Sequence, residues 1–179
     1  TSANPKYANS VKDTLLIQIE GWKNSLRIHT NNNNVSIVKE NFYMPQLEKY
    51  RRIWIYLPPD YRTSKCSYPV YYAHDGQNLF DAASSFAGEW GIDECLDSLY
   101  LTGMEVPIVV GIDNGGTSRI DELTPWPNEK YGGGKAKLYS DFIVKTLKPY
   151  IDSAYRTLPD KKNTGVFGSS LGGLVSFYM

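Results

Sequence analysis

The stretch that decides the fold is Asn163–Leu174, with the sequence NTGVFGSSLGGL. It opens with a short run, Thr164–Phe167, whose composition predicts a strand. The run leads directly into Gly168-Ser169-Ser170-Leu171-Gly172, which fits the pattern G-x-S-x-G. Leu171–Tyr178 follows and is apolar nearly all round, as is typical of a buried helix. Strand, sharp turn and helix in this order are the setting that a nucleophile elbow requires.

The elbow predicts Ser170 as a catalytic nucleophile, held in a strained backbone conformation at the turn. Small neighbours, Gly168 and Gly172, let the strand and the helix approach each other. The helix N-terminus favours negative charge, and the backbone N–H of Leu171 is placed to form one half of an oxyanion hole. The alternative is a Gly- and Ser-rich turn without a catalytic role, because the pentapeptide alone arises by chance in about one chain in ten of this composition.

The second half of an oxyanion hole is expected in the loop after an earlier buried strand. Tyr68–Ala73 is a nearly continuous apolar run, and the loop that follows it, His74–Asp81, has the sequence HDGQNLFD. Gly76 would let the backbone turn an N–H group toward the site. We expect Gln77 to be the donor, with Asn78 as the alternative. Taken alone, the same loop also fits a plain polar turn.

The rest of the chain alternates between strand and helix patterns, which predicts an α/β fold. Val106–Ile112 lacks polar alternation, as do strands of a parallel sheet that are covered on both faces. Helical spacing marks Ile92–Tyr100, which ends near Gly103, and Leu138–Ala154, which Pro149 kinks or splits. The connection of about 24 residues before the second helix is longer than a plain connector, so we expect it to have a function or its own structure.

Antiparallel strands are expected at the N-terminal end. Strand patterns occur at Leu15–Trp22, Val35–Tyr43 and Arg52–Leu57, with the polar run Asn31–Asn34 as a hairpin loop. We find no internal repeat and no second domain. The sequence therefore predicts a single domain over residues 1–179, with antiparallel strands in 1–48 and a βαβ core in 49–179 that reaches the nucleophile elbow.

Composition narrows the class of protein. The 179 residues contain 19 basic and 19 acidic side chains, so no basic excess favours nucleic acid as a partner. Hydrophobic residues make up 41%, as in a globular protein, yet no apolar run is long enough to span a membrane. Two cysteines, Cys66 and Cys95, exclude a disulfide-dense scaffold, and we expect two free, partly buried thiols. With only two histidines, little material remains for a metal centre, and no metal or organic cofactor is expected.

Seven stretches, from about residue 50 to the end, carry a family resemblance. They are RRIWIYLPPDY, YPVYYAHDGQNLFD, EWGIDECLDSL, VPIVVGIDNGG, RIDELTPW, YSDFIVKTLKPYIDSAYRTLPD and NTGVFGSSLGGL. In this order they resemble the putative esterase family of α/β-hydrolases, which includes enterochelin, feruloyl and acetyl-xylan esterases, S-formylglutathione hydrolase and mycolyltransferases. The similarity is greatest to its bacterial branch of predicted α/β-superfamily hydrolases.

The resemblance implies the α/β-hydrolase fold: a mostly parallel central sheet with an antiparallel N-terminal part and helices on both faces, incomplete after the nucleophile elbow. By position, it implies Ser170 as the nucleophile and the backbone N–H groups of Leu171 and Gln77 as oxyanion donors. A further set of residues lies in a family segment that borders the active-site face, and we assign it no catalytic role. These residues are Asp121, Glu122, Pro125 and Trp126.

The sequence departs from the family at the catalytic triad. In α/β-hydrolases the acid and the His follow the Ser in chain order, but only nine residues follow Ser170, and no His occurs after His74. The chain is one part of a longer protein, an inactive truncation, or a divergent protein that uses Ser170 without a standard base. We expect the first, with the acid and the base beyond residue 179. We also expect residues 1–179 alone to be poorly soluble, because of an unpaired sheet edge and an exposed apolar face.

Neither histidine is expected to replace the missing base. His74 ends a strand beside the predicted oxyanion loop, and we assign it a structural role in preference to that of general base. His29 lies in the N-terminal region and is expected on a solvated edge. Asn34-Val35-Ser36 fits a glycosylation acceptor, which we attribute to chance among many Asn residues.

These observations predict a serine esterase that hydrolyses a carboxylic ester through an acyl-enzyme on Ser170. The substrate would be a small-molecule or polysaccharide ester: a siderophore ester, a feruloyl or acetyl ester, or a short-chain ester. Two alternatives stay open, an acyltransferase on the same machinery and a non-catalytic binding protein with the hydrolase fold. The sequence contains no signal peptide, and a secreted, periplasmic or cytoplasmic location stays open, as does the oligomeric state.

Overall fold

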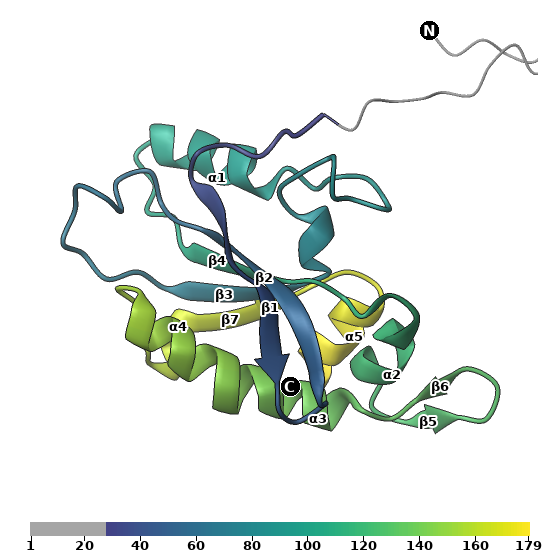
Figure 1. Ribbon diagram of the computed structural model, residues 1–179. Coiled ribbons are helices and arrows are strands. Elements are labelled where there is room, and N and C mark those ends of the chain that lie inside the picture. The colour runs from purple at the N-terminus through teal and green to yellow at the C-terminus, as the bar shows by residue number, and fades with distance from the viewer. Residues whose placement is uncertain (1–27) are drawn as a thin grey trace, which may run out of the picture.

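The computed structural model of the protein describes residues 28–179, which form a five-stranded sheet with helices on both faces (Figure 1). The strand predicted at Leu15–Trp22 lies outside the described residues. In chain order the elements are β1 Val35–Met44, β2 Lys49–Tyr56, β3 Val70–His74, η1 Gly76–Asn78, α1 Ile92–Leu101, β4 Ile108–Ile112, η2 Gly116–Ser118, α2 Arg119–Leu123, β5 Pro127–Asn128, β6 Gly132–Gly133, α3 Ala136–Phe142, η3 Ile143–Leu147, α4 Lys148–Ala154, η4 Lys161–Asn163, β7 Thr164–Phe167 and α5 Leu171–Tyr178.

The sheet combines an antiparallel part with a parallel part, as the sequence predicts. Its strand order is β1-β2-β4-β3-β7. Strand β2 pairs antiparallel with both β1 and β4, whereas β3 pairs parallel with β4 and with β7. The parallel strands carry their carboxyl ends to one edge of the molecule, where the turns after β3 and β7 lie next to each other.

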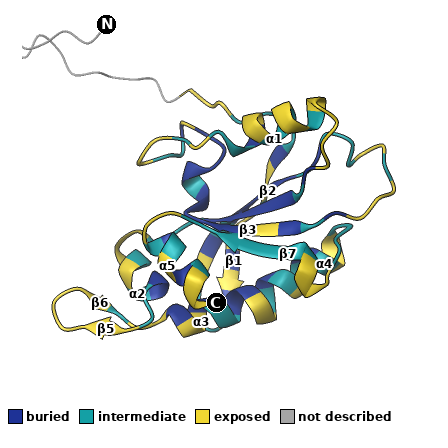
Figure 2. Cartoon of the chain, turned by 180° about the vertical axis from the view of Figure 1, so that it is seen from behind, coloured by how far each residue is buried: buried dark blue, intermediate teal, exposed yellow. Residues whose placement is uncertain are grey.

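Two hydrophobic layers hold the sheet between its helices. Helix α1 covers one face, and α3, α4 and α5 cover the other (Figures 1 and 2). Strand β2 alternates between the two layers, with Ile53 and Ile55 in the layer under α3 and Trp54 and Tyr56 in the layer under α1. All five residues of the central strand β4 are buried, which confirms the prediction of a strand covered on both faces.

The long helix predicted before the elbow is split, as expected from Pro149. It runs as α3, then as the π-helical turn η3, then as α4, in which Pro149 lies in the first turn. Proline has no N–H to donate and its ring crowds the preceding turn of an α-helix. The π turn lies directly before Pro149. Its hydrogen bonds join residues five apart, and so it accommodates the interruption of the α-helical pattern.

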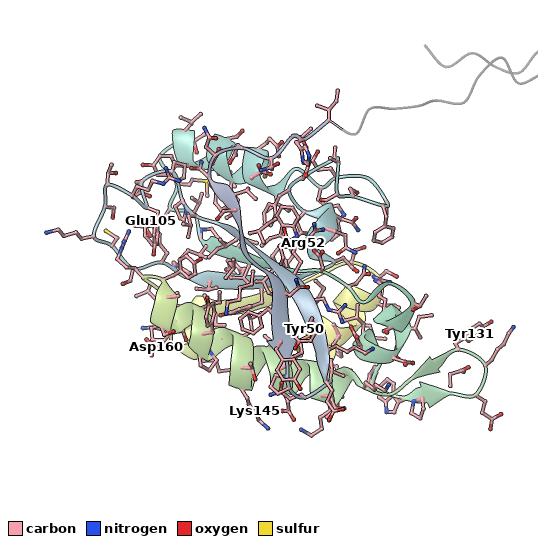
Figure 3. The ribbon with its side chains drawn as sticks, in the orientation of Figure 1. Tyr50, Arg52, Glu105, Tyr131, Lys145 and Asp160 are labelled. Atoms are coloured by element: carbon pink, nitrogen blue, oxygen red, sulfur yellow. The ribbon has the colours of Figure 1, made fainter. Side chains whose placement is uncertain are left out.

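The long connection between β4 and α3 has its own structure. It contains η2, α2 and the two-stranded hairpin β5–β6. The hairpin projects from the body of the molecule, with Tyr131 near its outer end and 60% exposed (Figure 3). In residues 28–179, none of the helices has both the length and the apolarity needed to cross a bilayer.

Two sequence expectations are wrong. Helix α5 was expected to be buried, but Phe177 is 94% exposed and only Gly172 and Val175 are buried. The reason is that β7 is the last strand of the described sheet, so that within residues 28–179 α5 has neighbours on one side only. Cys66 and Cys95 are free, as predicted, but they are exposed and not partly buried. Cys66 lies in the loop between β2 and β3, and Cys95 lies on α1.

Candidate active site

Ser170 occupies the sharp turn between β7 and α5. Its backbone has φ 54° and ψ −118°, a conformation that a residue with a side chain rarely adopts. The strand and the helix touch at two glycines, because a Cβ atom on Gly168 would lie 2.8 Å from the carbonyl carbon of Gly172. Ser170 is exposed, and within residues 28–179 its hydroxyl forms no hydrogen bond. The hydroxyl is therefore accessible to a substrate.

Leu171 is the first residue of α5, and its N–H group lies at the positive end of the helix. The first N–H groups of a helix have no partner within the helix. The Gly172 N–H donates to the Ser169 carbonyl at 2.8 Å, whereas the Leu171 N–H has no recorded acceptor among the described residues. A donor is therefore available directly beside Ser170.

The turn after β3 lies against this helix N-terminus. A Cβ atom on Gly172 would lie 3.1 Å from Cβ of His74 and 3.5 Å from Oδ2 of Asp75. Asp75 has the left-handed φ of 57°, which redirects the chain into η1. The backbone N–H of Gln77, in η1, likewise has no recorded acceptor within the part of the chain that the structure describes. Two N–H groups without acceptors thus belong to adjoining turns.

Three side-chain contacts hold the η1 turn in place. The guanidinium of Arg119 donates to both oxygens of the Asp75 carboxylate, from Nε at 2.6 Å and from Nη2 at 2.7 Å. Asn114 Nδ2 donates to Asp75 Oδ1 at 2.6 Å, and the Asn114 backbone N–H donates to Gln77 Oε1 at 3.0 Å. The hydrogen bonds that Arg119 donates to the Asp75 carboxylate raise the pKa of Arg119, so the guanidinium stays protonated. The loop after β4 therefore fixes the loop after β3.

Gly76 is required at the start of η1 because the backbone of β4 is close. A Cβ atom there would lie 2.8 Å from the Gly111 carbonyl carbon and 2.9 Å from the Asp113 backbone nitrogen. Sequence reasoning identified Gly76 and Gln77 but missed Asn114 and Arg119. A single Asn and a single Arg in a Gly-rich loop form no periodic pattern, and only the fold shows that they reach the loop after β3.

His74 lies in the core beneath both turns. It is fully buried, and burial lowers its pKa to about 4, so the ring is neutral at pH 7. The Ser176 hydroxyl donates to the Gly172 carbonyl at 2.7 Å, which leaves its oxygen to accept from His74 Nε2 at 3.1 Å. His74 Nδ1 then accepts from the Tyr139 hydroxyl at 2.9 Å. Both ring nitrogens are occupied by groups other than Ser170, as expected for a structural role.

His29 does not face the elbow. Its side chain is 77% exposed and its Nδ1 lies 2.8 Å from the buried Asp81 carboxylate. Asp81 also accepts from the Thr30 and Ala83 backbone N–H groups. His29 is thus on a solvated edge, as predicted. Asn34, in the sequence that fits a glycosylation acceptor, donates through its side chain to Asp97.

The residues of the RIDELTPW segment have different environments. Glu122 is buried and accepts from Arg51 Nη2 at 2.8 Å and from Lys49 Nζ at 3.2 Å, so it gives the buried Arg51 guanidinium an acidic partner. The Asp121 carboxylate accepts the Gly133 N–H at 2.7 Å and thereby anchors the β5–β6 hairpin. Trp126, which follows Pro125, is 71% exposed. None of these contacts involves Ser170.

Comparison with known proteins places this arrangement in a family. The model of the Esterase family, described as "Putative esterase", matches residues 45–179. The chain belongs to the putative esterase family. It is 30% identical over 134 residues to the Bacillus subtilis (strain 168) protein named "Uncharacterized protein YbbA", a match that covers 72% of this chain and 50% of that protein.

Solved structures support the α/β-hydrolase fold of this family member. The IroE-like serine hydrolase from Shewanella oneidensis is 29% identical, with a TM-score of 0.60, and the match covers 80% of this chain and 45% of that chain. The enterobactin esterase FES from Shigella flexneri is 21% identical, with a TM-score of 0.63, and the match covers 83% of this chain and 34% of that chain. The chain therefore spans about half the length of the relatives that it matches, or less.

Proposed function

We propose that this chain supplies the nucleophile and the oxyanion hole of a serine esterase. The observation that carries the proposal is the position of Ser170, exposed at φ 54° between β7 and the N-terminus of α5. The match of the Esterase family model over residues 45–179 supports it. In the proposed reaction the Ser170 hydroxyl attacks an ester carbonyl, the alcohol leaves, and water hydrolyses the resulting acyl-enzyme.

The N–H groups of Leu171 and Gln77 are the proposed donors to the negatively charged oxygen. Each has no recorded protein acceptor within residues 28–179, so neither has to give up a hydrogen bond when a substrate binds. Donors that are fixed before the reaction stabilise the developing charge without reorganisation, and losing one typically costs a factor of about 10² to 10³ in rate. The ion pair between Arg119 and Asp75 keeps the Gln77 turn in position.

The general base and its acidic partner are proposed to come from a further segment of the whole protein. His74 cannot take the Ser170 proton, because both of its nitrogens are already hydrogen-bonded in the core. The match covers only 50% of the Bacillus subtilis relative, and in α/β-hydrolases the acid and the His follow the nucleophile in chain order.

A fluorophosphonate probe tests the nucleophile. The complete protein should gain one probe mass, and peptide mapping should place the adduct on Ser170. Ser170→Ala should not be labelled, whereas Ser169→Ala, a matched change at the exposed neighbouring Ser, should keep most of the labelling. An unlabelled wild-type protein, or a labelled Ser170→Ala protein, would refute the proposal.

The proposed substrates are esters of the kinds named for the structural neighbours. One neighbour is described as an enterobactin esterase and another as a ferulic acid esterase. Hydrolysis of enterobactin, methyl ferulate and p-nitrophenyl acetate should therefore be compared at equal enzyme concentration. Turnover that disappears in Ser170→Ala for at least one ester is expected, and product analysis with an added sugar acceptor would separate hydrolysis from acyl transfer.

A further inference from the structure

Three carboxylates gather around the beginning of α1. Glu89, Asp93 and Glu94 each present a carboxylate oxygen, and these oxygens all lie within 4.8 Å of one another. Glu94 is exposed, Glu89 is half-buried and Asp93 is fully buried, so the group is partly open to solvent. None of the three belongs to the elbow or to the η1 turn.

Asp93 is the unusual member of this acidic cluster. One of its oxygens, Oδ2, accepts the Asn32 backbone N–H at 3.1 Å. The other, Oδ1, is buried and has no hydrogen-bond partner. A buried carboxylate oxygen without a donor is costly, because it has lost its water and gained nothing in return.

The described part of the chain provides little positive charge to balance the cluster. Within residues 28–179 no Lys, Arg or His forms an ion pair with Glu89, Asp93 or Glu94. The sequence of α1, IDECLDSLYL, contains acidic residues but no basic one. The Thr30 hydroxyl donates to Glu89 Oε1 at 2.7 Å, which orients that carboxylate but does not neutralise it. The positive end of the helix offsets only part of the repulsion.

We propose that Glu89, Asp93 and Glu94 bind a divalent cation, with Ca²⁺ as the ion that fits best. Ca²⁺ takes oxygen ligands at 2.3–2.6 Å in flexible geometry and completes its shell with water. Three clustered carboxylates that are partly open to solvent match that requirement. The ion would give the orphaned Asp93 oxygen a partner and remove the repulsion between Asp93 and Glu94.

The bound ion would also brace the turn that carries Gln77. The Trp90 N–H donates to the Asn78 carbonyl at 2.8 Å, and the Ile92 N–H donates to the Leu79 carbonyl at 3.1 Å. The segment that holds the acidic cluster is thus hydrogen-bonded to the end of η1. The site is structural and takes no part in bond breaking, so the inference stands independently of the proposed esterase activity.

Thermal unfolding of the metal-free protein with added salts tests the site. CaCl₂ should raise the Tm by about 3–6 °C once it is tenfold above its Kd, since binding to the folded state alone stabilises it. MgCl₂ should act more weakly, and NaCl at equal ionic strength should not reproduce the shift. Isothermal titration should give one Ca²⁺ per chain.

Two variants and a control make the result specific. Asp93→Asn should abolish the Ca²⁺-dependent shift, and Glu94→Gln, an exposed change that leaves the core intact, should weaken Ca²⁺ binding at least tenfold. Asp141→Asn removes a half-buried carboxylate that is paired with Lys137 and Lys145, away from the cluster, and should keep the full shift. A wild-type Tm that does not respond to 10 mM CaCl₂, or an equal response in Glu94→Gln, would overturn the proposal.

Discussion

The turn after β3 and the turn after β7 lie side by side, yet they are held by different forces. The turn after β3 is fixed by its side chains, since the Asp75 carboxylate takes three hydrogen bonds from Arg119 and Asn114. The turn after β7 is fixed by backbone packing, since Gly168 touches Gly172. Within residues 28–179 the Ser170 hydroxyl therefore takes no part in holding its own turn.

This contrast predicts that the two turns respond to different changes. The elbow should be sensitive to added volume and insensitive to loss of charge. The η1 turn should be sensitive to loss of charge. It should tolerate larger side chains better than the elbow does, except at Gly76. Each of the following predictions tests one side of that contrast.

The largest effect is expected from Gly168→Ala. The new methyl group would lie within 3 Å of both the Gly172 backbone and the His74 ring, and neither neighbour is the free end of a flexible side chain. The free energy of unfolding should fall by about 3 kcal/mol, as measured by urea denaturation. Gly173→Ala is the matched control, since its nearest contact is the Gly168 carbonyl oxygen at 3.3 Å. Equal losses in both variants would contradict packing at the elbow.

His74, which supports both turns, should make stability depend on pH. In the unfolded chain His74 binds a proton near pH 6.5, whereas in the folded protein the pKa of His74 is lowered to about 4. Stability should therefore fall as the pH falls through this window, by up to about 3 kcal/mol from this group. Denaturation at a series of pH values should show a shallower slope in His74→Gln than in the wild type. Parallel slopes would show that His74 does not contribute.

Removing charge should affect the η1 turn. Asp75→Asn keeps the shape of the side chain but breaks the pair with Arg119, which is partly exposed, so a loss of about 2 kcal/mol is expected. Labelling of Ser170 by a fluorophosphonate should slow about tenfold as the Gln77 N–H loses its fixed position. Asp141→Asn, whose carboxylate lies outside both turns, should label at the wild-type rate. Normal labelling of Asp75→Asn would show that the pair is not needed to position the turn.

The smallest predicted effect is a gain in stability, in contrast to the losses predicted above. Ser170→Gly should be more stable than Ser170→Ala by about 1 kcal/mol, because glycine adopts φ 54° without strain whereas alanine keeps the strain of serine. Chemical denaturation of the two variants measures the difference. Equal stabilities would mean that the elbow conformation stores no strain.

The sequence predicts the elements well where a local pattern specifies them. Thr164–Phe167 and Leu171–Tyr178 agree with β7 and α5, because a strand, a Gly-rich turn and an apolar run leave few alternatives. The sequence predicts burial less well: the exposure of Phe177 depends on which elements surround α5, and no local pattern shows that. The ion pair of Asp75 with Arg119 was missed for a similar reason, because 44 residues separate its members and only the strand order brings them together. The roles of Ser170, Leu171 and Gln77 stay predictions.

The hydrogen-bonded chain Tyr139–His74–Ser176 links three elements, α3, β3 and α5. Each member satisfies the next, so replacing any one of them leaves a buried polar atom without a partner. A change that is harmful alone becomes tolerable only when its neighbours change with it. We therefore expect these three positions to covary among relatives, as a single inherited unit beneath Ser170.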